Sequence, residues 1–221
     1  NFAEPAAVEA ADLIGAVLGA TTWKTNAHMM VDIFRLGYVK PEDLTIDVAW
    51  GRGVWWKIVA PDNLTTHDKY TLDGVDYRQL PHPDGTFDVG VADFPYVATG
   101  GKKTSTLEAN GSDFNNRYGL HSDETRTPET LRAMNHDGLI EVFRVVKPGG
   151  IVLVKCMPYI SSGRLQDEPY LFKRLVLDTS LGTLVDELHH LAKAPRMQPA
   201  FNLDGTPRVQ RLLLGKIAGE Y

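Results

Sequence analysis

A short run of polar and aromatic groups, Asp93-Phe94-Pro95-Tyr96, offers the clearest chemistry in the sequence. It follows an apolar run, residues 87–92, that predicts a strand. The Asp93 carboxylate and the Phe94 carbonyl could accept the two protons of one amino group, which would turn the nitrogen lone pair towards an electrophile. Pro95 favours an extended Phe94 and so helps to fix its carbonyl, and Tyr96 could stack on a flat ring. The alternative interpretation is a strand that ends in a proline turn with its acid in solvent.

A glycine turn after another predicted strand could cradle a nucleotide-like ligand. Residues 44–53 (LTIDVAWGRG) predict a strand and then a tight turn, and a short helix is expected over the two tryptophans that follow. Gly51 and Gly53 permit positive φ and close approach of the backbone, and the N-terminus of a helix offers free N–H groups. Asp47 precedes these glycines by four and six residues, and the strand-turn-helix context strengthens the interpretation.

Two further acids follow along the chain. A strand around residues 63–67 is predicted to end at Asp68, about 20 residues after the start of the glycine-turn strand, where a doubly wound fold places an acid that binds ribose hydroxyls. The alternative interpretation of Asp68 is an aspartate that caps a turn. Residues 74–81 predict a short strand with Asp76 near its start.

Helices and strands are predicted around these groups. Apolar residues at helical spacing predict helices over 5–18, 27–38, 128–146 and 169–178. Lys147-Pro148-Gly149-Gly150 predicts a turn, residues 151–156 a buried strand and residues 208–217 a final strand. Residues 181–191 also carry leucine and valine at helical spacing.

The segment 97–127 follows the candidate catalytic residues directly. It is dominated by Gly, Ser, Thr, Asn and charged residues and lacks strong periodicity, which is typical of a functional lid or a disordered loop. Some of its basic and aromatic side chains are expected to contact the substrate: Lys102, Lys103, Arg117 and Tyr118. The alternative interpretation of these side chains is solvated loop surface.

Length and composition indicate one soluble domain over residues 1–221. The net charge of −5 requires any contact with nucleic acid to be local. No apolar run approaches the roughly 18 residues of a membrane span. The single cysteine, Cys156, suits a reducing cytoplasm and is expected to be a small core residue. The histidines lack ligand-like spacing with cysteine or acids, so no metal site is expected.

Taken in order, the glycine turn, Asp68, Asp76, the strand end at Asp93 and the KPGG turn resemble the S-adenosylmethionine-dependent methyltransferases. More narrowly, residues 23–156 resemble the amino-methyltransferases of DNA, which act on the exocyclic amine of adenine or cytosine. The cofactor loop of that family reads D-x-x-x-G-x-G, and its catalytic motif reads D-P-P-Y or a close variant. Here Phe94 replaces the first proline and keeps the carbonyl.

The resemblance implies a role for each matching residue. Asp93-Phe94-Pro95-Tyr96 would hold the target base and catalyse the transfer. S-adenosylmethionine would be bound by residues from several elements: Thr25 and Asn26 near its methionine carboxylate, Asp47, Gly51 and Gly53 around its methionine part, Asp68 at its ribose, Asp76 at its adenine amine, and Asp93.

The resemblance also implies the fold: a doubly wound, Rossmann-like class I α/β domain with a seven-stranded, mostly parallel sheet and an antiparallel last strand. For this reason residues 183–190 are expected to form the sixth strand, against their helical spacing. Residues 97–127 would be a long loop on the substrate side.

The expected reaction is in-line transfer of a methyl group from a sulfonium to the exocyclic amine of a DNA base, adenine favoured over cytosine. The base must leave the DNA stack to reach the cofactor. Methylation of an RNA base or of a protein glutamine is the alternative among enzymes. An inactive module that binds cofactor or nucleic acid is the alternative from another class.

Overall fold

The computed structural model describes residues 23–95, 127–161 and 164–189. In chain order the elements are α1 (Asn26–Arg35), β1 (Leu44–Asp47), β2 (Asn63–Thr66), β3 (Phe87–Ala92), α4 (Pro128–Val145), β4 (Val146–Val154), β5 (Tyr159–Ser161), β6 (Arg164–Gln166) and α5 (Glu168–Asp178). Several predictions lie outside the described residues: the helix over 5–18, the strand over 208–217, Tyr96, and the segment after it up to residue 126 with Lys102, Lys103, Arg117 and Tyr118.

The predicted α/β class is confirmed, because β1 to β4 form a four-stranded sheet in the order β2-β1-β3-β4. All three pairings in this sheet are parallel. Thr45 lies between Leu64 of β2 and Val89 of β3, so β1 is a central strand. The strands expected at the start of residues 44–53, around 63–67 and over 87–92 are present as Leu44–Asp47, Asn63–Thr66 and Phe87–Ala92.

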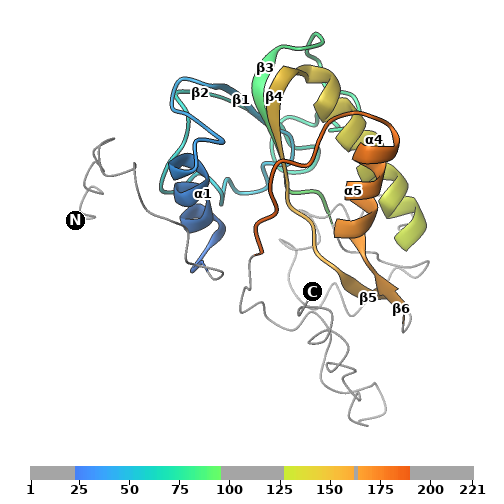
Figure 1. The fold of residues 1–221 in the computed structure, drawn as a ribbon. Helices are drawn as coiled ribbons and strands as arrows, with labels where there is room; N and C mark the ends of the chain where they lie inside the picture. The colour runs from blue at the N-terminus through green and yellow to red at the C-terminus, as the bar shows by residue number, and fades with distance from the viewer. Residues whose placement is uncertain (1–22, 96–126, 162–163, 190–221) are drawn as a thin grey trace.

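Helices cover the two faces of this sheet (Figure 1). On one face, Val89 and Val91 of β3 belong to the same core cluster as Met30 and Ile33 of α1. On the other face, Ala92 belongs to a cluster with Leu139 and Val142 of α4. This alternation follows from the two-residue period of a strand, and it explains why β3 is apolar almost throughout.

Gly90 lets α4 pack closely on β3. A Cβ atom built on Gly90 would lie 2.6 Å from Cγ1 of Val142 and 2.9 Å from Cγ2 of Val146. A larger residue would therefore push the helix away from the strand that carries Asp93 at its end.

Local sequence accounts for the helix starts. Thr127 caps α4 through a reciprocal pair of bonds with Thr130, and Pro128 follows in the first turn, as predicted. Asp167 caps α5 by accepting from the Tyr170 N–H, and Pro169 lies in the first turn of that helix. The helices predicted over 27–38, 128–146 and 169–178 are confirmed, with ends that differ by at most a few residues.

Two predicted elements between the strands are wrong. The short helix expected after Gly53 is a series of turns, with i→i+3 bonds from the Gly53 N–H to the Trp50 carbonyl and from the Trp56 N–H to the Gly53 carbonyl. Residues 74–81 form no strand, because the Asp76 side chain and carbonyl accept bonds from the next residues along the chain and hold a turn.

The predicted turn at Lys147-Pro148-Gly149-Gly150 is instead an irregular part of β4. The strand begins at Val146, which pairs with Phe87, and the register shifts before Ile151 pairs with Val89. Gly149 takes a φ of 81°, which suits glycine at such a bulge. Residues 151–154 are half-buried and not fully buried as predicted, because β4 is an edge strand of the described sheet.

Neither interpretation of the segment after α5 is correct. Residues 183–189 are neither the expected sixth strand nor a helix, and His190 lies outside the described residues. Leu184 is 53% exposed and Val185 67%, so their helical spacing buries no apolar face. The sequence also gave no sign of the antiparallel pair β5 and β6.

None of the helices in the described part of the chain is long and apolar enough to cross a membrane.

Candidate functional site

The acids predicted to be functional lie where three neighbouring strands end. Asp47 is the last residue of β1, Asp68 follows β2 by two residues, and Asp93 directly follows β3. Because the strands are parallel, their carboxyl ends lie at one edge of the sheet. From β1 the chain adds β2 on one side of the sheet, and it then crosses to add β3 on the other side of β1. The strand order therefore reverses between β1 and β3, and the three acids lie on either side of this point. Ligands of open α/β sheets bind at such a point.

The glycine turn has the backbone that its sequence predicts. Gly51 has a φ of 55° and Gly53 a φ of 60°, which are conformations that other residues adopt only with strain. The Gly51 N–H donates to Oδ2 of Asp68 over 2.8 Å, and the Thr71 hydroxyl donates to the Gly51 carbonyl over 3.0 Å. These bonds fix the turn to the segment after β2.

Asp68 caps this segment. Its Oδ1 accepts the backbone N–H groups of Tyr70 and Thr71 over 2.9 and 2.8 Å, while its Oδ2 accepts that of Gly51. The side chain is 8% exposed. Of the two interpretations of Asp68, the turn cap is therefore present in the structure. Binding of Asp68 to the ribose of a cofactor stays a prediction.

Asp47 is a buried acid at the centre of the edge. It is 2% exposed, and its carboxylate accepts the Ala49 N–H over 3.1 Å and the Trp56 indole N–H over 2.7 Å. Burial raises the pKa of Asp47 to about 6, against the effect of these two donors, and the charges of Asp93 and Asp68 add to the rise. The sequence did not suggest that Trp56 would contact this carboxylate.

Asp93 is held from two sides. The Trp55 indole N–H donates to its Oδ2 over 3.1 Å, and the Lys155 ammonium lies 3.2 Å from Oδ1 and 3.1 Å from Oδ2. Lys155 also lies 5.9 Å from the centre of the Trp55 ring. Lys155 was not among the predicted site residues, although its position directly after an apolar strand was a usable signal.

Phe94 and Pro95 are fixed by groups from α4 and α5. The Phe94 ring is buried and lies 4.9 Å from the Tyr77 ring and 6.0 Å from the Phe172 ring, between ring centres. The Pro95 carbonyl accepts the Asn135 amide N–H over 2.8 Å, and Asn135 in turn accepts the Tyr77 hydroxyl over 3.1 Å. No sequence pattern indicated the role of Asn135, because its partners lie 40 and 58 residues away.

The other residues predicted to bind the cofactor do not directly follow a strand of the sheet. Thr25 precedes α1, is exposed, and its hydroxyl bonds to Nδ1 of His28 over 2.8 Å; Asn26 is the first residue of that helix. Asp76 forms ion pairs with Arg78 at 2.6 Å and Lys69 at 2.9 Å. Burial acts to raise the pKa of Asp76, but these cations hold it well below its ordinary value. Contact of these residues with a cofactor stays a prediction.

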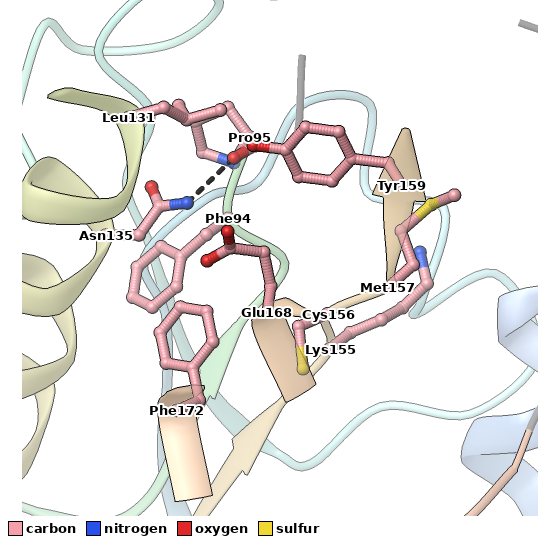
Figure 2. A pocket seen from close by; sticks show the side chains of 10 residues that line it. All are labelled: Phe94, Pro95, Leu131, Asn135, Lys155, Cys156, Met157, Tyr159, Glu168 and Phe172. Atoms are coloured by element: carbon pink, nitrogen blue, oxygen red, sulfur yellow. Dashed lines mark hydrogen bonds between the residues drawn. The ribbon is translucent and has the colours of Figure 1, made fainter. Parts of the chain in front are cut away.

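A small pocket adjoins the strand end on the side of α4 and α5 (Figure 2). Its lining is mainly apolar and aromatic, with a few polar groups: Phe94, Pro95, Leu131, Asn135, Lys155, Cys156, Met157, Tyr159, Glu168 and Phe172. Burial raises the pKa of the Cys156 thiol to about 12, so this thiol is protonated at neutral pH and is no nucleophile.

Comparisons with protein-family models, with curated proteins and with solved structures gave no match for this chain. Within residues 23–95, 127–161 and 164–189, no group of three or more His, Cys, Asp or Glu side chains is arranged to hold a metal ion. The functional interpretation therefore rests on the carboxyl edge of the sheet and on the pocket beside it.

Proposed function

We propose that this chain is an S-adenosylmethionine-dependent methyltransferase that acts on the exocyclic amine of a DNA base, adenine favoured over cytosine. One observation carries the proposal: the glycine turn is joined to both Asp68 and Asp93, through the Gly51 N–H and the Trp55 indole. The residues expected to bind the cofactor and those expected to bind the amine therefore share one edge of the sheet. In this proposal the four described parallel strands belong to a doubly wound, seven-stranded class I sheet.

The charges of the edge suit a cationic cofactor. Asp47, Asp68 and Asp93 are close enough that the latter two raise the pKa of the first. S-adenosylmethionine carries a sulfonium and an ammonium, so its binding would relieve this repulsion. A Cβ atom built on Gly51 would meet nothing within 4 Å among the described residues, which leaves room for a ligand against the backbone there.

The residues that would hold the cofactor are those implied by the family resemblance. Asp47, Gly51 and Gly53 would surround its methionine part, Asp68 would accept from its ribose, and Asp76 would accept from its adenine amine. Thr25 and Asn26 would lie near its carboxylate. When bound, the cofactor supplies an electrophilic methyl group.

Asp93 would orient the amine. Its carboxylate accepts one N–H of the amine, and the Phe94 carbonyl accepts the other, so that the nitrogen lone pair points towards the methyl group. The Trp55 indole and the Lys155 ammonium keep the Asp93 carboxylate in one place. Alignment of this kind can supply several kcal/mol of the rate enhancement. The Asp93 carboxylate would also take the proton that the amine loses on methylation.

The substrate would present a flipped or single-stranded base, because the amine of a stacked base is out of reach. With a net charge of −5, the chain would contact phosphates locally, through Lys102, Lys103 and Arg117, and Tyr118 would also contact the substrate. Tyr96 would stack on the base. RNA bases and protein glutamines present the same NH₂ group and are alternative substrates.

An inactive binding module is the second candidate, and the Asp93 contacts favour it. Lys155 and Trp55 already engage the carboxylate that the amine would need. Phe94 also replaces the first proline of the family motif.

Transfer of tritiated methyl groups from S-adenosylmethionine tests the proposal. Unmethylated DNA, RNA and an unmethylated protein extract serve as parallel acceptors, and mass analysis of nucleosides identifies the product. We expect N6-methyladenine in DNA. Transfer to RNA or to protein only would show that the substrate is not DNA. Cofactor binding without transfer to any acceptor would support the inactive module. Absence of both binding and transfer would exclude the proposal.

A further inference from the structure

Two histidine rings face each other across a hydrogen bond. Nε2 of His67 lies 2.7 Å from Nε2 of His82, and the ring centres are 5.0 Å apart. His67 directly follows β2 and is 9% exposed, whereas His82 lies in the segment before β3 and is half-buried. The His82 ring also packs edge-on against the uncharged ring of Phe87 on β3. The proposed function gives neither histidine a role.

Asp73 determines where the pair carries its protons. Nδ1 of His67 lies 2.5 Å from Oδ2 of Asp73, so this nitrogen is protonated and donates to the carboxylate. Nε2 of a neutral His67 is then an acceptor, and Nε2 of His82 donates to it. If His67 takes one further proton, its own Nε2 becomes the donor and Nε2 of a neutral His82 accepts. The bond between the rings therefore survives one proton more than the neutral pair carries.

A second additional proton breaks this bond. Both Nε2 atoms would then carry a hydrogen, and two donors at 2.7 Å have no acceptor between them. The two imidazolium charges would also repel each other. The doubly protonated pair must therefore separate.

The groups around His82 oppose its protonation. Arg144 of α4 donates to the His82 carbonyl over 2.8 Å and forms ion pairs with Asp84 and Glu141. Burial lowers the pKa of His82, and the charges of His67 and Arg144 add to the fall. Separated rings bind the second proton more readily, so the bonded pair loses stability relative to them as pH falls below the ordinary histidine value of 6.5.

The pair borders a loop that carries two acids assigned to the cofactor. His67 and His82 lie 15 positions apart, and residues 68–81 between them form no helix or strand. Asp68 and Asp76 belong to this loop. The second half of the loop is bonded to α4, so its first half is the part that depends most on the segment after β2.

Asp73 connects the His67 ring to this first half. Its Oδ2 accepts from His67, and its Oδ1 accepts the backbone N–H groups of Asp68 and Val75 over 3.2 Å each. The His67 backbone is itself fixed, because its N–H donates to the Asp47 carbonyl over 2.9 Å. When the two rings repel each other, the movement is therefore taken up by side chains and reaches the Asp68 backbone through Asp73.

We propose that His67 and His82 form a pH-sensitive switch, in which the bond between the rings holds the loop 68–81 in place and a second additional proton releases it. This inference goes beyond the proposed function and does not need it, since the switch acts in the chain alone. If the proposed function also holds, release of the loop should weaken cofactor binding in acid, because the loop carries Asp68 and Asp76.

NMR of the imidazole nitrogens and backbone amides of the full chain tests the switch. In the neutral pair, His67 should carry its proton on Nδ1. Between about pH 7 and about pH 4.5, the amide signals of Asp68 and Gly74 should shift together with the second protonation of the pair. Their N–H groups bond to Asp73 and to the Asp68 carbonyl within the loop. A pair that takes both protons while these amides stay unchanged would overturn the inference.

His82→Gln locates the effect. The amide can present either an acceptor or a donor to His67 and gains no charge, so the acid transition of the loop amides should vanish. His189→Gln is the matched control, because the His189 side chain is 64% exposed and lies 3.8 Å from Glu187, and this variant should keep the transition. A transition that persists in His82→Gln would belong to another group and would overturn the inference.

His82→Ala provides a second variant in case His82→Gln does not fold. It lacks the bond between the rings at every pH, so its loop amides should already show at neutral pH the signals that the wild type shows in acid. Signals at neutral pH identical to those of the wild type would overturn the inference.

Calorimetry with S-adenosylmethionine separates the switch from the proposed function. Between about pH 7 and about pH 5, the affinity of the wild type should fall about three- to tenfold more than that of His82→Gln. If the loop amides show the transition that depends on His82 but the cofactor binds at no pH, the proposed function fails and the switch stands. If the cofactor binds and methyl transfer occurs while the amides show no transition, only the switch fails.

Discussion

The Trp55 indole N–H donates to Oδ2 of Asp93 over 3.1 Å, although the two residues lie 38 positions apart. Trp55 belongs to the turns after β1 and Asp93 follows β3, so this bond spans the point where the strand order reverses. Its neighbour Trp56 donates in the same way to Asp47 at the end of β1. Two adjacent indoles thus join the glycine turn to two acids of the candidate site.

Replacing Trp55 by Phe should lower methyl transfer by about tenfold, because the ring is kept while one hydrogen bond to the acid is lost. Rates at saturating cofactor measure this effect. Trp23→Phe is the control, because the Trp23 indole N–H also donates to a carboxylate, that of Asp32 on α1, over 2.7 Å. A similar loss of transfer in both variants would indicate a general loss of stability.

Asp93→Ala should reduce transfer by at least about a hundredfold, because the amine loses its main oriented acceptor. Cofactor affinity, measured by calorimetry, should fall far less than transfer. Asp88→Ala is the control from the same strand, where the carboxylate is partly exposed and pairs with Lys147 over 2.7 Å. If Asp93→Ala loses cofactor binding and transfer together, the role assigned to Asp93 is wrong.

The buried acid Asp47 should make stability depend on pH. Its folded pKa of about 6 lies above its ordinary value of 3.8, so the folded state binds this proton more tightly than the unfolded state. The contribution of Asp47 to the free energy of unfolding should therefore fall as pH rises from about 4 to about 6, by at most about 3 kcal/mol, and stay constant above that.

Urea denaturation of the wild type and of Asp47→Asn across this pH range checks the effect. The variant should gain stability relative to the wild type as pH rises. Asp88→Asn should show no such change between about pH 4 and about pH 6, because bonds from Lys147 and the Leu44 N–H lower the pKa of Asp88 below its ordinary value of 3.8. A difference between wild type and Asp47→Asn that stays constant with pH would contradict the prediction.

Gly51→Ala should destabilise the protein by about 1–2 kcal/mol, because the φ of 55° strains any residue with a Cβ atom. Gly51→Asn should cost less, since asparagine tolerates this backbone conformation better. A Cβ atom at Gly51 would meet no described atom within 4 Å, so both variants should fold. Equal costs in thermal unfolding would show that backbone strain is not the cause.

Substituting Lys102 and Lys103 together by Ala should weaken binding to single-stranded DNA and reduce the slope of log K against log salt by about 1.4. Fluorescence anisotropy between low and high salt measures the slope. The expectation comes from the sequence, where the two lysines follow a glycine pair in the segment after the candidate catalytic residues. An unchanged slope would remove them from the DNA-binding surface.

The sequence determined the features that depend on local interactions. The apolar run of β3, the capped starts of α4 and α5, and the positive φ of Gly51 and Gly53 follow from side chains within a few positions along the chain. The sequence also determined that Asp47, Asp68 and Asp93 lie at one edge of the sheet, because the carboxyl ends of parallel strands share an edge.

Predictions of secondary structure from local sequence were wrong where tertiary contacts and burial determine the backbone conformation. The leucines and valine after α5 have helical spacing, but Leu184 and Val185 are exposed while Leu188 packs against the core, so the segment buries no continuous apolar face. The tryptophans after Gly53 suggested a helix, yet their indoles bond to acids at two strand ends and the backbone forms turns.

Tertiary structure alone decided the partners of the acids. Lys155 reaches Asp93 across 62 positions, and Arg132 reaches Glu168 across 36. Neither pairing leaves a periodic trace in the sequence, because each depends on where two separate elements pack. The sequence thus determined which acids lie at the edge of the sheet, and packing decided which groups hold them.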